Sequence, residues 1–287
     1  MTRAPNTTEE RPAMQQSTTK IYWPIGLTRE MPGRTSQGEA IEAVLGEYAR
    51  SVVAPGTSVS IGWMAKTTSL LSSHFLGMLN DAYVIGDILK AQREGFDAAM
   101  IGPHWDPGLY GAREAASIPV SGPLEAAAMV AQTLGRSFAV LTVHEGYVPM
   151  IERSLRVYGC EGRAISRRPV RRFGMSYANL ETALSGASDE FLQEFTKTAL
   201  ECIADGADVI IAGGQLFGPI FQRHRYLQVP GTGVPVVEVA ACGLKMAETL
   251  VSLRRSVGLC KSEHPNAPFR TPPAAALEQV RKDFGVG

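Results

Sequence analysis

Three side chains able to do chemistry, His104, Trp105 and Asp106, stand together in the segment Gly95–Leu109. They follow the apolar run Ala98–Ile101, which is bounded by turn residues and is typical of a buried strand in a parallel sheet. Ligands of open α/β sheets bind outside the carboxyl ends of the strands. The pattern therefore predicts a site in this loop, with an imidazole able to accept or donate a proton near neutral pH.

Asp106 has two interpretations. Because it precedes a proline at the start of a helical pattern, Asp106 on its own is typical of the cap of the next helix. As a neighbour of the imidazole it would stabilise the protonated ring and fix its tautomer, which predicts a His104 tuned toward the working pH. We expect His104 to be the side chain that matters most for turnover.

The rest of the chain alternates strand-like and helix-like segments. Strand patterns cover Lys20–Trp23, Thr57–Trp63, Ala98–Ile101, Phe138–Thr142, Asp208–Ala212 and Val234–Val237. Helical patterns cover Gly38–Val53, Asn80–Glu94, Tyr110–Ala116, Leu124–Leu134, Val148–Tyr158, Asp189–Ala204 and Ala240–Leu253. This alternation predicts a doubly wound, parallel α/β architecture.

Two strand–loop units look alike, GFDAAMIGPHWDPG and GADVIIAGGQLFG, and predict two similar halves that face each other across a cleft. We expect a disordered tail over residues 1–18, a first α/β domain over 19–121 that is completed by 232–258, and a second α/β domain over 122–231. Residues 259–287 are expected to form a C-terminal tail.

Composition excludes several classes of partner. Twenty-eight basic residues balance 28 acidic ones, so no nucleic acid is expected, and the basic run at 167–172 is interpreted as a solvated edge or linker. No apolar stretch approaches the roughly 20 residues that span a bilayer, which predicts no membrane segment. Four scattered cysteines fit a reducing cytoplasm, and we expect a cytoplasmic homo-oligomer.

Four segments, which occur in this order along the chain, resemble a known family: GFDAAMIGPHWDPGLYGAREAASIPVSGPLEAAAMVAQTLG, FAVLTVHEGYVPMIE, GADVIIAGG and VPVVEVAACGLKMAETLV. They resemble the aspartate/glutamate/hydantoin racemase superfamily, most of all its hydantoin racemase branch, as does the ending VGLCKSEHPNAPFRTPP. The resemblance implies two α/β domains related by a pseudo-twofold axis, with a small carboxylate or cyclic ureide bound between them.

The same resemblance implies a pair of catalytic cysteines, one from each domain, that this chain lacks. A two-base racemase needs both groups because inversion removes a proton from one face of a carbon and returns it to the other. The family register puts Pro103 at the first cysteine position and Gly214 at the second. The family's Asn-rich turn after the first strand is also replaced, here by residues 23–26.

Protonatable residues on the loops that the family register turns toward the cleft are the candidates to replace the thiols. The expected catalytic residues are His104, Asp106, His144 and Glu238. The expected substrate-binding residues are Trp23, Pro103, Trp105, Thr142, Glu145, Tyr147, Gly213, Gly214 and Gln215.

Three functions remain open at this point. The first is a cofactor-independent isomerase, lyase or decarboxylase that works by acid/base chemistry next to a carbonyl. The second is a metal-dependent hydrolase or lyase, since histidine and carboxylate groups also bind metals. The third is a binding protein without turnover. Fold alone cannot choose among them.

Overall fold

The structure, a computed structural model, describes residues 18–28, 38–67 and 73–284. The expected N-terminal tail lies outside these residues apart from Thr18. The strands are β1 (Thr19–Pro24), β2 (Thr57–Gly62), β3 (Ala98–Met100), β4 (Val120–Ser121), β5 (Phe138–Thr142), β6 (Val170–Arg172), β7 (Val209–Ala212) and β8 (Val236–Glu238). The helices are α1 (Gly38–Val52), α2 (His74–Arg93), α3 (Leu109–Ala115), α4 (Pro123–Leu134), α5 (Val148–Val157), α6 (Tyr177–Ser185), α7 (Asp189–Ala204), α8 (Phe217–His224), α9 (Val239–Val257) and α10 (Ala274–Phe284), with 3₁₀ turns η1 (Glu145–Tyr147) and η2 (Glu161–Arg163).

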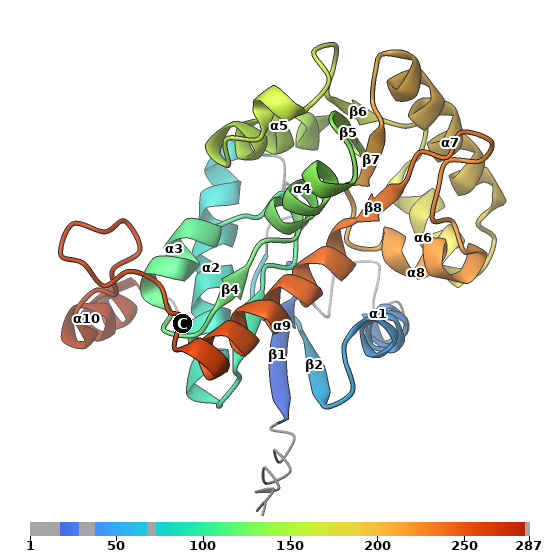
Figure 1. The fold of residues 1–287 in the computed structure, drawn as a ribbon. Coiled ribbons are helices and arrows are strands. Elements are labelled where there is room, and N and C mark those ends of the chain that lie inside the picture. The colour runs from blue at the N-terminus through green and yellow to red at the C-terminus, as the bar shows by residue number, and fades with distance from the viewer. Residues whose placement is uncertain (1–17, 29–37, 68–72, 285–287) are drawn as a thin grey trace, which may run out of the picture.

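In the described part of the chain the strands form two four-stranded sheets, in the orders β2-β1-β3-β4 and β6-β5-β7-β8. Every strand pair in both sheets is parallel. If the four strands of each sheet are numbered 1 to 4 in chain order, both sheets have the order 2-1-3-4. This shared order fits two related halves. The expected α/β class with two parallel-sheet domains is confirmed (Figure 1).

The placement of β8 corrects one expectation. This strand pairs with β7, with Val236 opposite Ile210, and so belongs to the second sheet and not to the first. The helix that follows it, α9, packs against β1, β3 and β4 of the first sheet. Because Glu238 ends the strand and caps the helix, the chain passes from one domain to the other within a single residue (Figure 1).

A second helix crosses between the domains in the opposite direction. Helix α4 follows β4 of the first sheet but packs against β7 and β8 of the second, and α4 and α9 pack against each other. The largest hydrophobic cluster also includes residues of both domains, among them Trp23 and Tyr48 from the first and Leu141 and Phe217 from the second. The two domains therefore share the largest of the three hydrophobic clusters.

The basic run at 167–172 contains β6, an edge strand of the second sheet. Its outer position agrees with the expected edge, but Arg171 is only 4% exposed. The Arg171 guanidinium pairs with Asp205 and lies 4.0 Å from Glu201, so its burial is compensated by opposite charge. The run is thus part of the folded domain and not a linker.

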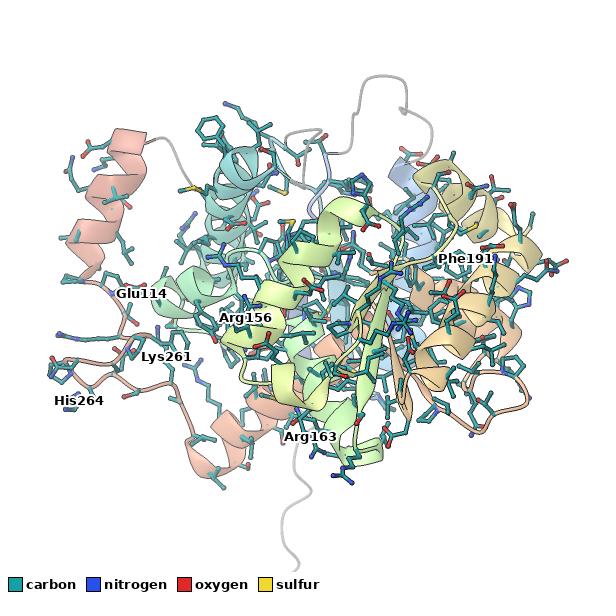
Figure 2. The ribbon with its side chains drawn as sticks, turned by 90° about the horizontal axis from the view of Figure 1, so that it is seen from above. Glu114, Arg156, Arg163, Phe191, Lys261 and His264 are labelled. Carbon is teal, nitrogen blue, oxygen red and sulfur yellow. The ribbon has the colours of Figure 1, made fainter. Side chains whose placement is uncertain are left out.

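The C-terminal tail is docked on the first domain and contains α10. Lys261 Nζ donates to the carbonyl oxygens of Arg113 and Glu114 at the end of α3, 2.8 and 2.7 Å away, and Figure 2 shows Lys261 close to Glu114. The Phe269 ring packs edge-on against Tyr110, with ring centroids 5.2 Å apart. Among the described helices, none is both long and apolar enough to cross a bilayer.

Candidate functional site

Hydrogen bonds join the carboxyl ends of the two sheets. His104 Nε2, in the loop after β3, lies 3.3 Å from Thr142 Oγ1 at the end of β5. Gln215 Nε2, after β7, donates to the carbonyl oxygen of Ile25, after β1, over 3.0 Å. The strand ends of both halves therefore face one another, which is where parallel sheets place ligands.

His104 lies in a dry aromatic environment. It is only 5% exposed, and its ring centroid lies 5.1 Å from that of Trp105 and 5.2 Å from that of Tyr147. The Trp105 and Tyr147 rings stack, with centroids 4.4 Å apart. Burial disfavours the charged ring and lowers the pKa of His104 to about 3. The expectation of an imidazole tuned toward neutral pH is corrected, because in this structure the ring is neutral.

Asp106 binds a helix and not the imidazole. Its carboxylate accepts hydrogen bonds from the backbone N–H groups of Leu124 and Glu125, over 3.0 and 2.9 Å, and from the Tyr158 hydroxyl over 2.8 Å. It therefore caps α4, a later helix than the one expected from the sequence. Burial raises the pKa of Asp106 to about 7, although these hydrogen bonds act in the opposite direction.

Glu238 forms a hydrogen-bonded pair with Tyr48 of α1. Its carboxylate accepts from the backbone N–H groups of Ala240 and Ala241, over 2.9 and 2.7 Å, and from the Tyr48 hydroxyl. Burial raises the pKa of Glu238 to about 7, and burial next to this carboxylate raises the pKa of Tyr48 well above its usual value. The sequence provided no signal for Tyr48, because its place in the helical pattern of 38–53 is an apolar one.

Hydrocarbon fills the space beside both expected cysteine positions. The Pro103 ring packs on Gly26 so closely that a Cβ at Gly26 would lie 2.5 Å from Pro103 Cγ. A Cβ at Gly214 would lie 2.6 Å from Cε2 of the buried Phe217 ring. A side chain larger than hydrogen at 214 therefore requires Phe217 to move.

The four cysteines lie elsewhere. Cys160 and Cys202 are buried and Cys260 is exposed in the tail. Cys242, on α9, is half-buried, and burial together with the nearby Glu238 raises the pKa of its thiol to about 12. A thiol with this pKa is protonated at neutral pH and is a weak nucleophile.

Among the residues that the structure describes, two buried polar atoms at the strand ends have no hydrogen-bond partner. They are the indole Nε1 of Trp23, whose side chain is 0% exposed, and the amide Oε1 of Gln215. The donation from Gln215 Nε2 to Ile25 fixes the orientation of the amide and leaves Oε1 as the atom without a partner. Buried polar atoms are nearly always paired in proteins, so this donor and this acceptor depart from the usual pattern.

Four other expected residues divide into two near His104 and two at the surface. Thr142 and Tyr147 contact His104, whereas His144 and Glu145 are exposed on η1. His144 Nδ1 accepts from Gly146 N over 3.0 Å, and the His144 ring lies 5.1 Å from that of Tyr147. Among the described residues, no group of three or more His, Cys, Asp or Glu side chains comes together as a metal site would require.

Two doubly wound parallel sheets whose strand ends face each other define a two-domain α/β architecture. Residues 38–247 match the family model described as Asp/Glu/Hydantoin racemase. The chain therefore belongs to this family of racemases.

Individual relatives agree with this assignment. The chain is 35% identical over 168 residues, 58% of its own length and 66% of the relative's, to a hydantoin racemase of Rhizobium meliloti. It is 31% identical over 195 residues, 67% of its length and 73% of the relative's, to a hydantoin racemase of Pseudomonas sp. (strain NS671). The crystal structure of an allantoin racemase from Pseudomonas fluorescens superposes with a TM-score of 0.72 at 27% identity, over 88% of this chain and 97% of that one.

Proposed function

We propose that this chain is an isomerase that inverts a carbon next to a carbonyl in a small cyclic ureide, with His104 and Glu238 acting in place of two thiols. Its membership of the racemase family supports the reaction class, and the names of its relatives favour a racemase over a lyase or a decarboxylase. Hydantoin and allantoin, the substrates in those names, are both cyclic ureides.

The observation that carries the choice of substrate is the pair of unpartnered polar atoms. Trp23 Nε1 is a donor and Gln215 Oε1 is an acceptor, and both are buried. A ureide ring presents both a carbonyl acceptor and an N–H donor, the two kinds of group that these atoms lack as partners. An analogue without the N–H would leave Gln215 Oε1 unpaired, which costs binding free energy.

The charge states of the two proposed catalytic groups suit proton transfer in one direction. Near and below pH 7 the Glu238 carboxyl holds a proton that it can donate, while the His104 ring is neutral and can accept one. Negative charge that develops on the substrate favours the protonated ring and so strengthens His104 as a base during the reaction. His104 follows β3 and Glu238 ends β8, so the two groups come from different sheets.

Hydrogen exchange tests the proposal. Single enantiomers of a 5-substituted hydantoin and of allantoin are incubated in D₂O, with loss of the C–H signal followed by NMR and inversion followed by circular dichroism. We expect His104→Ala to slow both processes on the order of 10²–10⁴-fold, the effect typical of losing an acid/base group. His264→Ala is the matched control, because Figure 2 places His264 in the exposed C-terminal tail. Near-wild-type exchange in His104→Ala contradicts the assignment.

Thiol alkylation tests the independence from cysteine. We expect iodoacetamide to modify the exposed Cys260 and to leave turnover unchanged, because the high pKa keeps the Cys242 thiol protonated. Mass spectrometry identifies the alkylated residue. Rapid inactivation that follows modification of Cys242 would show that a thiol does take part.

The packing at Pro103 and Gly214 favours a second candidate, a ureide-binding protein without turnover. Titration calorimetry with the same ureides separates the two functions. Binding that is weakened by Trp23→Phe, together with hydrogen exchange no faster than in buffer, supports the binding protein.

A further inference from the structure

A cavity of about 430 Å³ lies between α2, the loop after β3 and α5, apart from the proposed acid/base pair. Small-molecule sites have volumes of about 300–1,000 Å³. The cavity lies between the two domains, because α2 belongs to the first and α5 to the second. Its inner wall includes Trp105 and Asp106, the neighbours of His104, and hydrogen bonds to Ser154 and Tyr158 of the second domain hold this wall in place.

Two opposite charges line this cavity without forming an ion pair. Asp81, on α2, is half-buried and accepts a hydrogen bond from Gly108 N. Burial raises the pKa of Asp81 to about 6, while the charge of Arg153, exposed on α5, and the hydrogen bond from Gly108 N act in the opposite direction. No described residue forms a hydrogen bond or an ion pair with Arg153. Its guanidinium can therefore bind a carboxylate in the bidentate geometry that arginine prefers.

The remaining wall of the cavity is apolar. Met78, Tyr110 and Val157 line the rim and are 72%, 41% and 52% exposed. Met150 lines the same space from α5. Exposed apolar side chains around a concave surface are typical of a binding site, because covering them with a ligand removes apolar area from water.

The geometry points to a second ligand site here, for an α-amino acid with an apolar side chain, with its ammonium group on Asp81, its carboxylate on Arg153 and its side chain against Met78 and Met150. A carboxylic acid alone would use only the arginine, and an amine alone only the aspartate. The zwitterion uses both charges and leaves neither one unpaired in the complex. This site is independent of the proposed ureide isomerase activity.

Calorimetry with three related probes tests the site on the full chain: L-leucine, 4-methylpentanoate, which lacks the ammonium group, and 3-methylbutylamine, which lacks the carboxylate. We expect L-leucine to bind about 10- to 100-fold more tightly than either analogue, the factor typical of a hydrogen bond to a charged group. Asp81→Asn should remove the preference over 4-methylpentanoate. Arg153→Gln should remove the preference over 3-methylbutylamine.

Arg156→Gln is the matched control, since Arg156 lies on the same helix (Figure 2). It pairs with Glu161 and does not line the cavity. It should leave the affinities for all three probes unchanged. Because Arg153 is exposed, its variant is expected to fold even if Asp81→Asn does not. Equal affinities of the wild type for the three probes, or an undiminished preference in Arg153→Gln, would overturn the assignment.

Discussion

Burial, and not residue type alone, sets the protonation states of His104 and Glu238 at neutral pH. A histidine in water is half protonated at pH 6.5, but the aromatic environment of Trp105 and Tyr147 keeps the His104 ring neutral down to a pKa of about 3. The same cost of burying charge raises the pKa of Glu238 to about 7, so this carboxyl keeps its proton near neutral pH. Both shifts favour the uncharged form.

This histidine also makes stability depend on pH. Between its unfolded pKa of 6.5 and its native pKa of about 3, the unfolded chain binds more protons than the native chain. The free energy of unfolding therefore falls as the pH is lowered through this window. At pH 5 the loss relative to pH 7.5 is about 2 kcal/mol.

Urea unfolding of the wild type and of His104→Asn, each at pH 7.5 and pH 5, measures this effect. Acidic groups such as Asp106, whose raised pKa has the opposite effect on stability, are present in both proteins and cancel in the comparison. We expect the wild type to lose about 2 kcal/mol more than the variant on acidification. Equal losses would show that His104 protonates in the native state.

At the scale of the element, the loops after β3 and β7 pack against neighbouring elements and leave little room for new side chains. The ring of Phe217, at the start of α8, fills the space beside Gly214. This ring belongs to an aromatic cluster with Phe173, Phe191 and Phe221, so it is held from several sides. The Phe217 ring of α8 therefore leaves no space for a cysteine side chain at position 214.

Gly214→Cys tests this closure. We expect the new side chain to destabilise the protein by about 1–3 kcal/mol, the usual cost of overpacking a core. Gly162→Cys is the control, since nothing lies within 4 Å of a Cβ at this glycine. Thermal unfolding compares the two variants, and equal melting temperatures would mean that Phe217 moves away freely.

At the scale of the whole molecule, the crossed helices α4 and α9 make the two domains depend on each other. Each of these helices follows a strand of one sheet and packs on the other sheet, and the largest hydrophobic cluster contains residues from both domains. Neither sheet is covered on both faces by helices from its own half alone. The site at the facing strand ends is correspondingly built on a shared core.

We expect the protein to unfold in one cooperative transition. Differential scanning calorimetry should give a single peak whose calorimetric enthalpy equals its van't Hoff enthalpy, as in a two-state protein. Two separate peaks would show that the two domains are stable independently.

The local pattern of apolar residues was sufficient to predict most of the helices and strands. The bounds expected for β5 and for α7, Phe138–Thr142 and Asp189–Ala204, are the observed ones. A continuous run of five residues marks the fully buried strand, and a helical apolar period over 16 residues marks the buried side of the helix. The elements without a prediction are short: the two-residue β4, the three-residue β6, and the helices α6, α8 and α10, which have 9, 8 and 11 residues.

The sequence by itself determined the α/β class, the two similar halves and the loop that carries His104, since these depend on residue types close together in the chain. Only the tertiary structure decided the partner of β8, the helix that Asp106 caps and the pairing of Glu238 with Tyr48, 190 residues away. The tertiary structure also determines that the His104 ring is neutral, because it buries the ring. Pairing and desolvation depend on which distant groups come together in space, and that is not encoded in the spacing of residues along one segment.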